Sequence, residues 1–506
     1  MKNFILLFFG VCTIGIIACT DLNEDLNSNI PGEIASEFIN SNTDVDALLR
    51  ATEDGLDLPI QDQSRFWAAS QHTSDETIGP TRGPDWDDNG VWRVLHDHTW
   101  SADHVFLTNT FNELLQVVFA ATNTLSFNPE ATVAAQAEFL RAYAIFNVVD
   151  GWNQVPFREP GSDLLADPDV LSGGDAVDRV ISDLEGAIAS LPDGPPNTPN
   201  KDAARVLLMK AFLNKGTFAD RTNPSFPAED MTQVISLADQ IINSGRYNLE
   251  GNFFGNFARD NDQISTENIW TLENEGGVRS GNARSRYFCT LHYNQNPSGW
   301  NGFTTLGDFY DKFEDSDIRR GAEYPGVTDR TGLRVGLLEG QQFDADGNAL
   351  QDRLGNPLSF TKEISLVESG ANLEVTGVRV VKYPPDYDSG DNIDNDYVIF
   401  RYADVLLMRA EALLRTGDSA GALEMVNSLR SARGASALAS LSEAELLDER
   451  GRELYWEGFR RQDMIRFGTF LDAYEQKPAS GEERLLFPIP ANVLATNPNI
   501  VQNPGY

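Results

Sequence analysis

Apolar residues recur at helical spacing along most of this chain. In the segment 129–150, for example, Ala137, Leu140 and Ala144 are three or four positions apart and therefore fall on one side of a helix. The same periodicity predicts helices over 103–125, 129–150, 175–191, 200–218, 229–245, 399–416, 419–433 and 442–475.

The run 442–475 has the clearest start signal. Ser442 and Glu445 form a capping box, in which each side chain satisfies a backbone N–H of the first turn. Gly451 and Gly458 lie inside the run, and each costs about 1 kcal/mol of helix stability relative to alanine. Glycines retained in a strong helical pattern indicate close approach between helices. The sequence therefore predicts helix-on-helix packing here.

The predicted helices come in pairs joined by short connections. Residues 416–418, Thr-Gly-Asp, link two of them. Small residues recur where the paired helices would touch, at Ala403, Ala410, Ala412, Ala420 and Ala422. Stacked helix pairs of this kind form tetratricopeptide-like solenoids. Because the period is imperfect and the pairs lie far apart in sequence, we expect a partial scaffold of this type.

The amino-acid composition changes between residues 246 and 398. Glycine, asparagine and aromatic residues become frequent and helix formers become rare. The segment 343–360, FDADGNALQDRLGNPLSF, contains two Gly-Asn turn signals and predicts a small hairpin. The segment 375–385, VTGVRVVKYPP, predicts a strand that ends at two prolines. Binding sites concentrate in loops held by a rigid frame, so this insert is a candidate for the ligand-binding part.

The chain begins with the layout of a secretory signal. Lys2 precedes an apolar stretch that ends at Ala18, and residues 1–18 are too short for a spanning helix, which needs about 20 apolar residues. The end of this stretch, Ile-Ile-Ala-Cys at 16–19, resembles a bacterial lipobox. We therefore expect cleavage before Cys19, acylation of its thiol, and a lipidated tether over 19–35. The alternative is an ordinary signal with a chance cysteine near the cut.

The other cysteines fit an exported protein without internal disulfides. Cys12 would leave with the signal and Cys19 would carry lipid, so Cys289 alone would remain. A chain of this length can bury a sufficient core without disulfides. We expect Cys289 to be a small buried residue and not a catalytic thiol.

The net charge of the chain disfavours anionic partners and favours a neutral ligand. The chain has 39 Lys and Arg against 76 Asp and Glu, a formal net charge of −37. Such a charge repels nucleic acid and strongly anionic polysaccharides. A neutral ligand fits better, and contact with a membrane is expected only through the lipid anchor.

Four segments resemble the signatures of one family. They are AEFLRAYAIFNVVDGWNQVPF (137–157), FRYADVLLMRAEALLRTGD (400–418), ERGRELYWEGFRRQDMIRFGTF (449–470) and LFPIPANVLATNPNIVQNPGY (486–506). In this order they resemble SusD/RagB-family proteins, the outer-membrane nutrient-binding lipoproteins of starch-utilisation-system type. The lipobox followed by the acidic TDLNED is similar to the start of these proteins. The resemblance spans nearly the whole mature chain.

The resemblance implies a fold, a place and a partner. The fold would be mostly α, a tetratricopeptide-like helix-pair scaffold with a loop-rich, partly β ligand-binding insert. Its parts would be 36–245, 246–398 and 399–506. The protein would be lipid-anchored on the outer face of the outer membrane of a Bacteroidota-like bacterium. It would pass an oligosaccharide to a SusC-like TonB-dependent transporter.

Two loops have the composition of a sugar site, and both resemble binding-face segments of some glycan-binding family members. They are PTRGPDWDDNGVW (80–92) and NQNPSGWNGF (294–303). A tryptophan face accepts the CH side of a sugar ring, and neighbouring polar groups take its hydroxyls. We expect Trp86 and Trp300 to stack on sugar. The expected hydroxyl partners are Arg82, Asp85, Asp88 and Asn301, and secondary candidates are Trp92, Tyr287 and Tyr293. Alternatively, each tryptophan fixes its loop to the scaffold.

The sequence also allows functions other than glycan binding. No nucleophile elbow, zinc-protease motif or phosphate-binding glycine loop is present, so catalysis is not expected, although a lipid-anchored glycoside hydrolase is the enzyme alternative. The histidines of HDHTWSADH (96–104) match no tight metal spacing, and DADGN (344–348) is only a faint calcium signal. No cofactor is therefore expected. A protein-binding scaffold and a peptide-binding member of the same family are the further alternatives.

Overall fold

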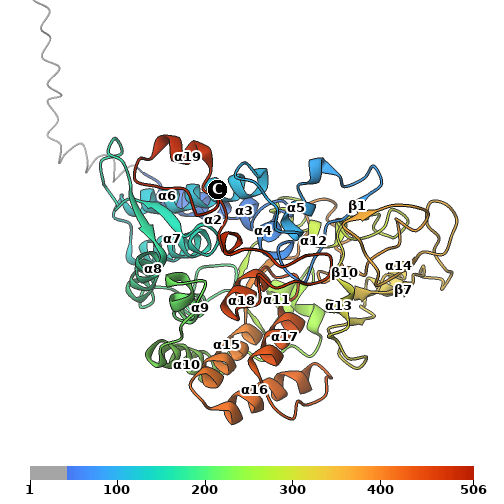
Figure 1. The fold of residues 1–506 in the computed structure, drawn as a ribbon. Coiled ribbons are helices and arrows are strands. Elements are labelled where there is room, and N and C mark those ends of the chain that lie inside the picture. The colour runs from blue at the N-terminus through green and yellow to red at the C-terminus, as the bar shows by residue number, and fades with distance from the viewer. Residues whose placement is uncertain (1–42) are drawn as a thin grey trace, which may run out of the picture. The chain divides into compact units, whose positions relative to one another are not determined.

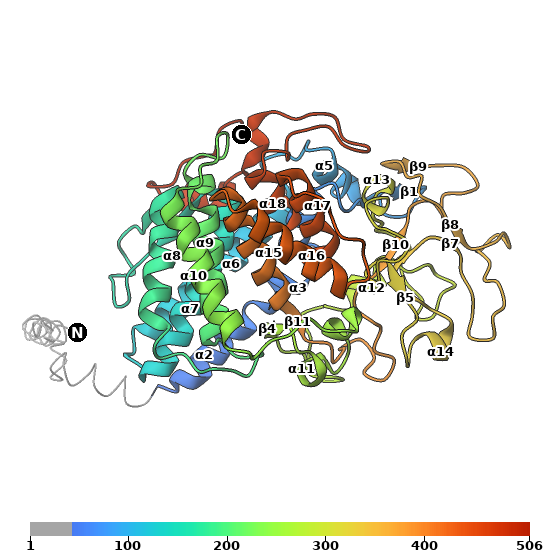
Figure 2. The ribbon, with the colours of Figure 1, turned by 90° about the horizontal axis from the view of Figure 1, so that it is seen from below.

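The computed structural model describes residues 43–506. The predicted signal 1–18, Cys19 and the tether 19–35 lie outside the described residues. Residues 45–506 form one compact unit. Figures 1 and 2 show helices gathered on one side of this unit and loop-rich structure on the other.

The scaffold consists of long helices that pack in chain order. Helix α6 packs on α7, α7 on α8, α8 on α9, α9 on α10, α10 on α15, and α15 on both α16 and α17. The helices are α2 (Val45–Asp54), α6 (Val105–Leu125), α7 (Ala131–Trp152), α8 (Gly173–Ala187), α9 (Lys201–Ala219), α10 (Ala228–Asn243), α15 (Tyr402–Arg415), α16 (Ser419–Ala432), α17 (Glu443–Leu454) and α18 (Arg460–Arg466). The expected mostly helical scaffold is confirmed.

The hydrophobic pattern explains which faces are buried. In α8, Val177, Val180 and Leu184 are buried and lie on one face, as the periodicity predicts. Helix α7 lies between α6 and α8 and also contacts α2 and α9, so nearly every side chain from Ala135 to Trp152 is buried. None of the helices formed by residues 43–506 combines the length and apolar character needed to cross a bilayer.

The predicted helix over 442–475 is interrupted, which corrects the sequence expectation. Its start is confirmed, because the Ser442 side chain accepts a hydrogen bond from the Glu445 N–H at 3.2 Å. The chain then leaves the helix, with φ of 61° at Trp456 and 87° at Gly458. Trp456 is only 1% exposed, so the break lies at a large ring that is buried in the core, and the periodicity did not reveal it.

The start of the predicted helix 399–416 is also different. Residues up to Arg401 form strand β11 (Tyr397–Arg401), which pairs antiparallel with β4 (Asn268–Leu272), and α15 follows at once. All five side chains of each strand are buried. A short, largely apolar run such as Tyr-Val-Ile-Phe fits either a buried strand or a helix, so pairing with a distant segment decided the outcome.

The remaining strands are short and lie mainly in the loop-rich part. β6 (Val335–Leu338) pairs with β5 (Gly321–Ala322) and β10 (Arg379–Val381), and β1 (Thr81–Arg82) pairs parallel with β9 (Val367–Glu368). Two further pairs are β2 (Gln154–Phe157) with β3 (Asp169–Ser172), and β7 (Gly340–Gln341) with β8 (Ser359–Phe360). The β7–β8 pair and the bridges between them confirm the hairpin predicted at 343–360.

Short helices connect these parts. They are α3 (Asp57–Gln61), α4 (Phe66–Gln71), α5 (Arg93–His96), α11 (Asn261–Ile264), α12 (Ser285–Phe288), α13 (Gly307–Tyr310), α14 (Thr328–Thr331) and α19 (Ala491–Thr496), with the 3-10 turns η1 (Asp88–Gly90), η2 (Phe253–Phe257) and η3 (Glu482–Leu485). The division into 36–245, 246–398 and 399–506 stays a prediction.

A buried ionic network joins the insert to the scaffold. The Glu453 carboxylate of α17 lies 2.6 Å from Arg401, 2.8 Å from Arg433 and 2.9 Å from Arg319. The side chains of all four residues are at most 1% exposed. The three arginines hold the pKa of Glu453 well below its usual value. These residues come from the insert, from the end of β11, from the position directly after α16, and from α17.

Removing the charge of Glu453 should destabilise the protein strongly. In Glu453→Gln the three buried arginines lose the carboxylate that they share, and each keeps at least one other buried carboxylate. Breaking a buried pair outright costs about 3–5 kcal/mol, so we expect a loss toward the lower end of this range. Chemical denaturation would measure the loss in the free energy of unfolding. Glu445→Gln is the matched control, because Glu445 is exposed on the same helix. Equal stability of the two variants would contradict the prediction.

Candidate ligand-binding site

Two loops bring Trp86 and Trp300 together although they lie 214 positions apart in the sequence. The Trp86 Nε1–H donates to the Trp300 carbonyl oxygen at 2.8 Å. The two ring centroids are 6.2 Å apart and the ring planes are inclined by 57°. The residues selected from sequence composition therefore form one aromatic cluster, whose role in binding stays a prediction.

The two rings differ in how much surface they offer. Trp300 is 47% exposed, and its ring packs edge-on against Phe288 at 4.9 Å. Trp86 is half-buried and packs on Phe303 at 4.8 Å between ring centroids. Trp92 is only 4% exposed and packs beneath Trp86. Trp300 is thus the accessible ring of the cluster, Trp86 is partly covered, and Trp92 belongs to the core.

Gly302 allows Trp86 to occupy this position. A Cβ atom at Gly302 would lie 2.2 Å from Cε2 of the Trp86 ring, far inside van der Waals contact. Trp86 itself has a φ of 60°, which L-residues other than glycine rarely adopt. Packing of the ring and its hydrogen bond to Trp300 hold this conformation. Strained residues held by their surroundings are typical of functional sites.

A second, polar part of the cluster contains Tyr293, Asp85 and Arg353. The Tyr293 hydroxyl donates to Asp85 Oδ2 at 3.0 Å. The Arg353 guanidinium lies over the Tyr293 ring at 4.0 Å and pairs with Glu374 at 2.5 Å. Burial, with the Asp85 bond next, raises the pKa of Tyr293 to about 12. Asp85 and Arg353 are both well exposed, so this part presents both acceptors and donors.

Two predicted hydroxyl partners are buried, which corrects their expected orientation. Arg82 is 1% exposed and donates to the carbonyl oxygens of Leu373 at 2.6 Å and Thr376 at 2.9 Å. Burial lowers the pKa of Arg82 to about 10. Asn301 is also 1% exposed and accepts from Arg379 at 2.7 Å. Both side chains tie their own loops to the segment 373–379 and offer no polar group to a ligand.

The other predicted site residues are also divided between the buried core and the exposed surface. Tyr287 is 2% exposed and belongs to the core, so it offers no face to a ligand. Asp88 is exposed and accepts from Trp92 Nε1 at 2.9 Å, which ties its loop to the core. Sequence reasoning missed Arg353 and Phe288. Arg353 lies in a turn of the 343–360 hairpin, and nothing in the sequence indicates that this hairpin approaches Tyr293.

The histidines of the segment 96–104 act as hydrogen-bond partners. His96 contacts the carbonyl oxygens of Thr77 and Glu475, and His98 contacts the Thr73 carbonyl and the Ser480 hydroxyl. Burial lowers the pKa of both. Within residues 43–506, no group of three or more His, Cys, Asp or Glu is arranged to hold a metal ion.

The weak calcium signal and the lone cysteine also have structural explanations. The Asp344 carboxylate accepts from the backbone N–H groups of Asp346 and Asn348, as in an ordinary Asx turn. Cys289 is fully buried, and burial raises the pKa of its thiol above the usual value. The expectation of a buried Cys289 is confirmed.

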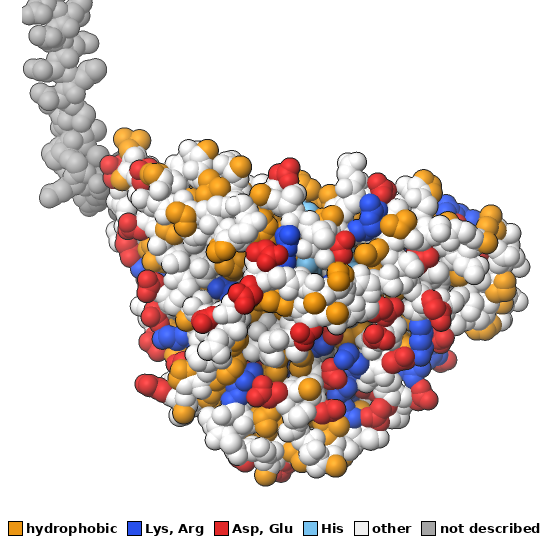
Figure 3. Space-filling view, viewed as in Figure 1, with side chains coloured by type: hydrophobic (Ala, Val, Ile, Leu, Met, Phe, Trp, Pro, Cys, Tyr) orange, Lys and Arg blue, Asp and Glu red, His pale blue; other side chains and the backbone are white. Residues whose placement is uncertain are grey.

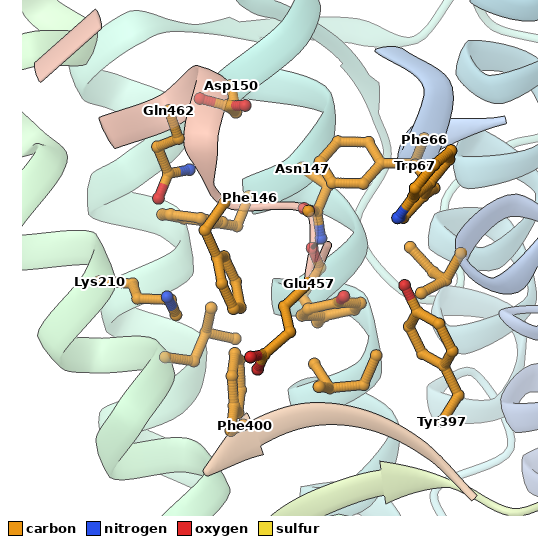
Figure 4. A pocket seen from close by; sticks show the side chains of 16 residues that line it. Phe66, Trp67, Phe146, Asn147, Asp150, Lys210, Tyr397, Phe400, Glu457 and Gln462 are labelled. Carbon is orange, nitrogen blue, oxygen red and sulfur yellow. Dashed lines mark hydrogen bonds between the residues drawn. The ribbon is translucent and has the colours of Figure 1, made fainter. Parts of the chain in front are cut away.

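The interior cavity in Figure 4 is too small for a sugar. Its volume is about 30 Å³, which suits a water molecule. Lys210 and Glu457 are among the polar side chains around it. Lys210 pairs with Asp404 at 2.7 Å, and burial lowers the pKa of Lys210.

On the surface, Figure 3 shows carboxylates spread over one face with lysines and arginines among them.

Comparison with known proteins gives consistent matches. Residues 266–506 match the model of the SusD family. The chain is 25% identical over 436 residues to the starch-binding protein SusD of Bacteroides thetaiotaomicron, covering 78% of this chain and 77% of that protein.

Solved structures share the fold. A SusD superfamily protein from Parabacteroides distasonis superposes with a TM-score of 0.71 at 17% identity, covering 91% of this chain and 98% of that one. Surface glycan-binding protein A from Bacteroides thetaiotaomicron, in complex with laminarihexaose, superposes with a TM-score of 0.67 at 16% identity, with the same coverage.

Adding one methyl group at Gly302 should disturb the aromatic cluster. Because Gly302→Ala forces the Trp86 ring away, we expect a loss of about 1–3 kcal/mol in the free energy of unfolding and a changed near-UV circular dichroism spectrum. Gly186→Ala in α8 is the control, since no atom lies within 4 Å of the added carbon. If Gly302→Ala were as stable as that control, with an unchanged spectrum, the close packing described here would be wrong.

Proposed function

The chain belongs to the SusD family, and we propose that it is a surface lipoprotein that captures neutral oligo- or polysaccharide for a SusC-like TonB-dependent transporter. Binding of glycan is the central part of this proposal. Anchoring through Cys19, exposure on the outer face of the outer membrane and delivery to the transporter extend it.

The single observation that carries the proposal is the exposed Trp300 ring beside Trp86 and the polar pair Asp85–Arg353. A sugar ring has an apolar CH face and a rim of hydroxyls that both donate and accept hydrogen bonds. Trp300 offers the flat apolar face, Arg353 offers donors, and Asp85 and Asp88 offer acceptors. By analogy with aromatic pairs, one stacked ring contributes about 1 kcal/mol, so affinity depends on several contacts.

The named relatives support a neutral ligand. SusD of Bacteroides thetaiotaomicron is named a starch-binding protein, and the surface glycan-binding protein A was solved with laminarihexaose. Starch and laminarihexaose are uncharged glucans. A formal net charge of −37 disfavours anionic polymers at long range, so the charge of this chain agrees with the same ligand class.

Two carboxyl groups whose pKa is raised, those of Glu76 and Asp396, are placed where they cannot act on a polysaccharide. Glycoside hydrolysis requires a carboxylic acid that stays protonated beside the substrate. Burial raises the pKa of Glu76 to about 8 and that of Asp396 to about 7. Both are at most 2% exposed and accept from backbone N–H groups, those of Trp456 and Asn274. Neither can face a bound polysaccharide.

Trp300→Ala should abolish most glycan binding and leave the fold intact. The ring is exposed, so its loss removes a stacking surface without opening a core cavity, and we expect affinity to fall about tenfold. Affinity electrophoresis in gels containing starch or laminarin would measure the change. Thermal unfolding would show whether the fold is kept.

Phe119→Ala is the matched control for this experiment. Phe119 is 53% exposed on α6, outside the tryptophan cluster, so its removal should leave retardation unchanged. If wild-type protein were retarded and Trp300→Ala were retarded equally, the site assignment would fail. If neither polymer retarded wild-type protein, a neutral glucan would not be the ligand.

Replacing Cys19 with alanine should release the protein from the membrane. The thiol is the proposed acceptor of the lipid, and stable anchoring requires more than one acyl chain. Wild-type protein should incorporate labelled palmitate and sediment with membranes, whereas Cys19→Ala should do neither. Cys12→Ala is the control, since Cys12 precedes the expected cleavage site. Labelled Cys19→Ala protein in the membrane fraction would refute the anchor.

A further inference from the structure

A second cavity opens between helices α11 and α14 and the chain segment 384–388. Its volume is about 440 Å³, within the range of small-molecule sites. The two helices lie along the lower edge of the molecule in Figure 2, in the loop-rich part. The lining includes Arg259, Tyr324, Arg330, Pro385, Tyr387 and Asp388.

The walls of this cavity combine apolar faces with hydrogen-bonding groups. Tyr324 and Tyr387 are half-buried, and Pro385 is buried beside them. Arg259 and Arg330 are 47% and 51% exposed at the side chain, so their N–H groups can reach a ligand. Apolar faces next to several donors and acceptors are what a sugar ring needs, as at Trp300.

Ion pairs hold the polar groups in place before any ligand arrives. The Asp388 carboxylate lies 2.5 Å from Arg259 and 3.0 Å from Arg330. The Arg330 guanidinium also lies over the Tyr387 ring at 4.7 Å. These contacts place the donors of Arg259 and Arg330 next to the acceptors of Asp388 in the cavity wall.

The charges around the cavity favour an uncharged ligand. Arg259 and Arg330 are the lining cations, whereas Asp260, Asp329 and Asp388 are lining carboxylates. Two positive charges against three negative charges give no net attraction for a uronate, sulfate or phosphate. A neutral polyhydroxylated ligand can use donors and acceptors alike.

One residue of the cavity wall, Tyr387, is hydrogen-bonded to the loop that carries Trp300. The Tyr387 hydroxyl donates to the backbone carbonyl of Asn296 at 2.8 Å and also contacts the Thr331 hydroxyl at 2.8 Å. Asn296 belongs to the loop that ends at Trp300, whose N–H donates to the Phe288 carbonyl at 2.8 Å. The loop that carries the exposed tryptophan is therefore in direct contact with one side chain of the cavity wall.

We infer that this cavity is a second subsite for the same neutral glycan, occupied only by chains long enough to extend beyond Trp300. The inference rests on the proposed function. A trisaccharide would bind at the tryptophan cluster alone, whereas a polymer would contact both sites. The second contact converts a separate binding event into an intramolecular one, so weak contacts add to the affinity for polymer.

Variants in the cavity wall test this inference, because their effect on binding should depend on the length of the glycan. Tyr324→Ala removes an apolar face, and Arg330→Ala removes an exposed donor without emptying the core. We expect each to weaken binding to laminarin or starch about three- to tenfold, in the range of one lost ring or charged contact. Binding of laminaritriose or maltotriose, measured by calorimetry, should stay unchanged.

Arg334→Ala is the matched control, because Arg334 is equally exposed, pairs with Glu323 and lies outside the cavity lining. Hydrogen exchange of wild-type protein gives an independent readout. Polymer should protect residues 258–264 and 324–331, and trisaccharide should not.

Each outcome decides between the two proposals. Unchanged polymer binding by both variants, with no polymer-induced protection, would overturn the second subsite alone if Trp300→Ala still loses binding. Equal losses for polymer and trisaccharide would also overturn it, because the cavity would then be part of the primary site. Failure of wild-type protein to bind any of these glucans would overturn the proposed function and this inference together.

Discussion

The structure depends on the burial of one carboxylate, that of Glu453, among three arginines from distant parts of the chain. Taking these charges out of water costs several kcal/mol per ion, so the arrangement is tolerated only when all partners are present. That condition fixes the mutual position of α17, α16, the end of β11 and the insert around Arg319. The ionic network restricts which arrangement of these segments can form. Its main effect is this restriction and not a large net gain in stability.

The same region supports the proposed binding surfaces from below. Lys382 follows strand β10, is fully buried, and donates to the Tyr455 carbonyl oxygen at 2.6 Å, just after α17. Two residues later the chain reaches Pro384, where the wall of the second cavity begins. On the other side, buried Arg379 of β10 holds Asn301 next to Trp300. Strand β10 therefore connects the ionic core to both surfaces.

The loops that carry the aromatic platform are rigid through many small contacts. Trp86 and Asn301 both have positive φ, and each is held by hydrogen bonds to another segment. Arg82 spans from its own loop to carbonyl groups near residue 375. A weakly binding site gains from such order, because little conformational entropy remains to be lost when a glycan binds.

The sequence by itself determined the helices, since an apolar stripe every three or four residues must be buried against a partner whatever the topology. It also predicted Trp86 and Trp300 as candidate stacking residues, because each lies in a loop rich in polar residues and glycine; their role in binding stays a prediction. Only the tertiary structure decided the break at Trp456, the strand before α15, and the burial of Arg82, Asn301, Trp92 and Tyr287. It alone brought Arg353 to Tyr293 and formed the cavity beside Tyr387. These features arise from contacts between segments far apart in the chain, and local periodicity carries no information about which distant segments will meet.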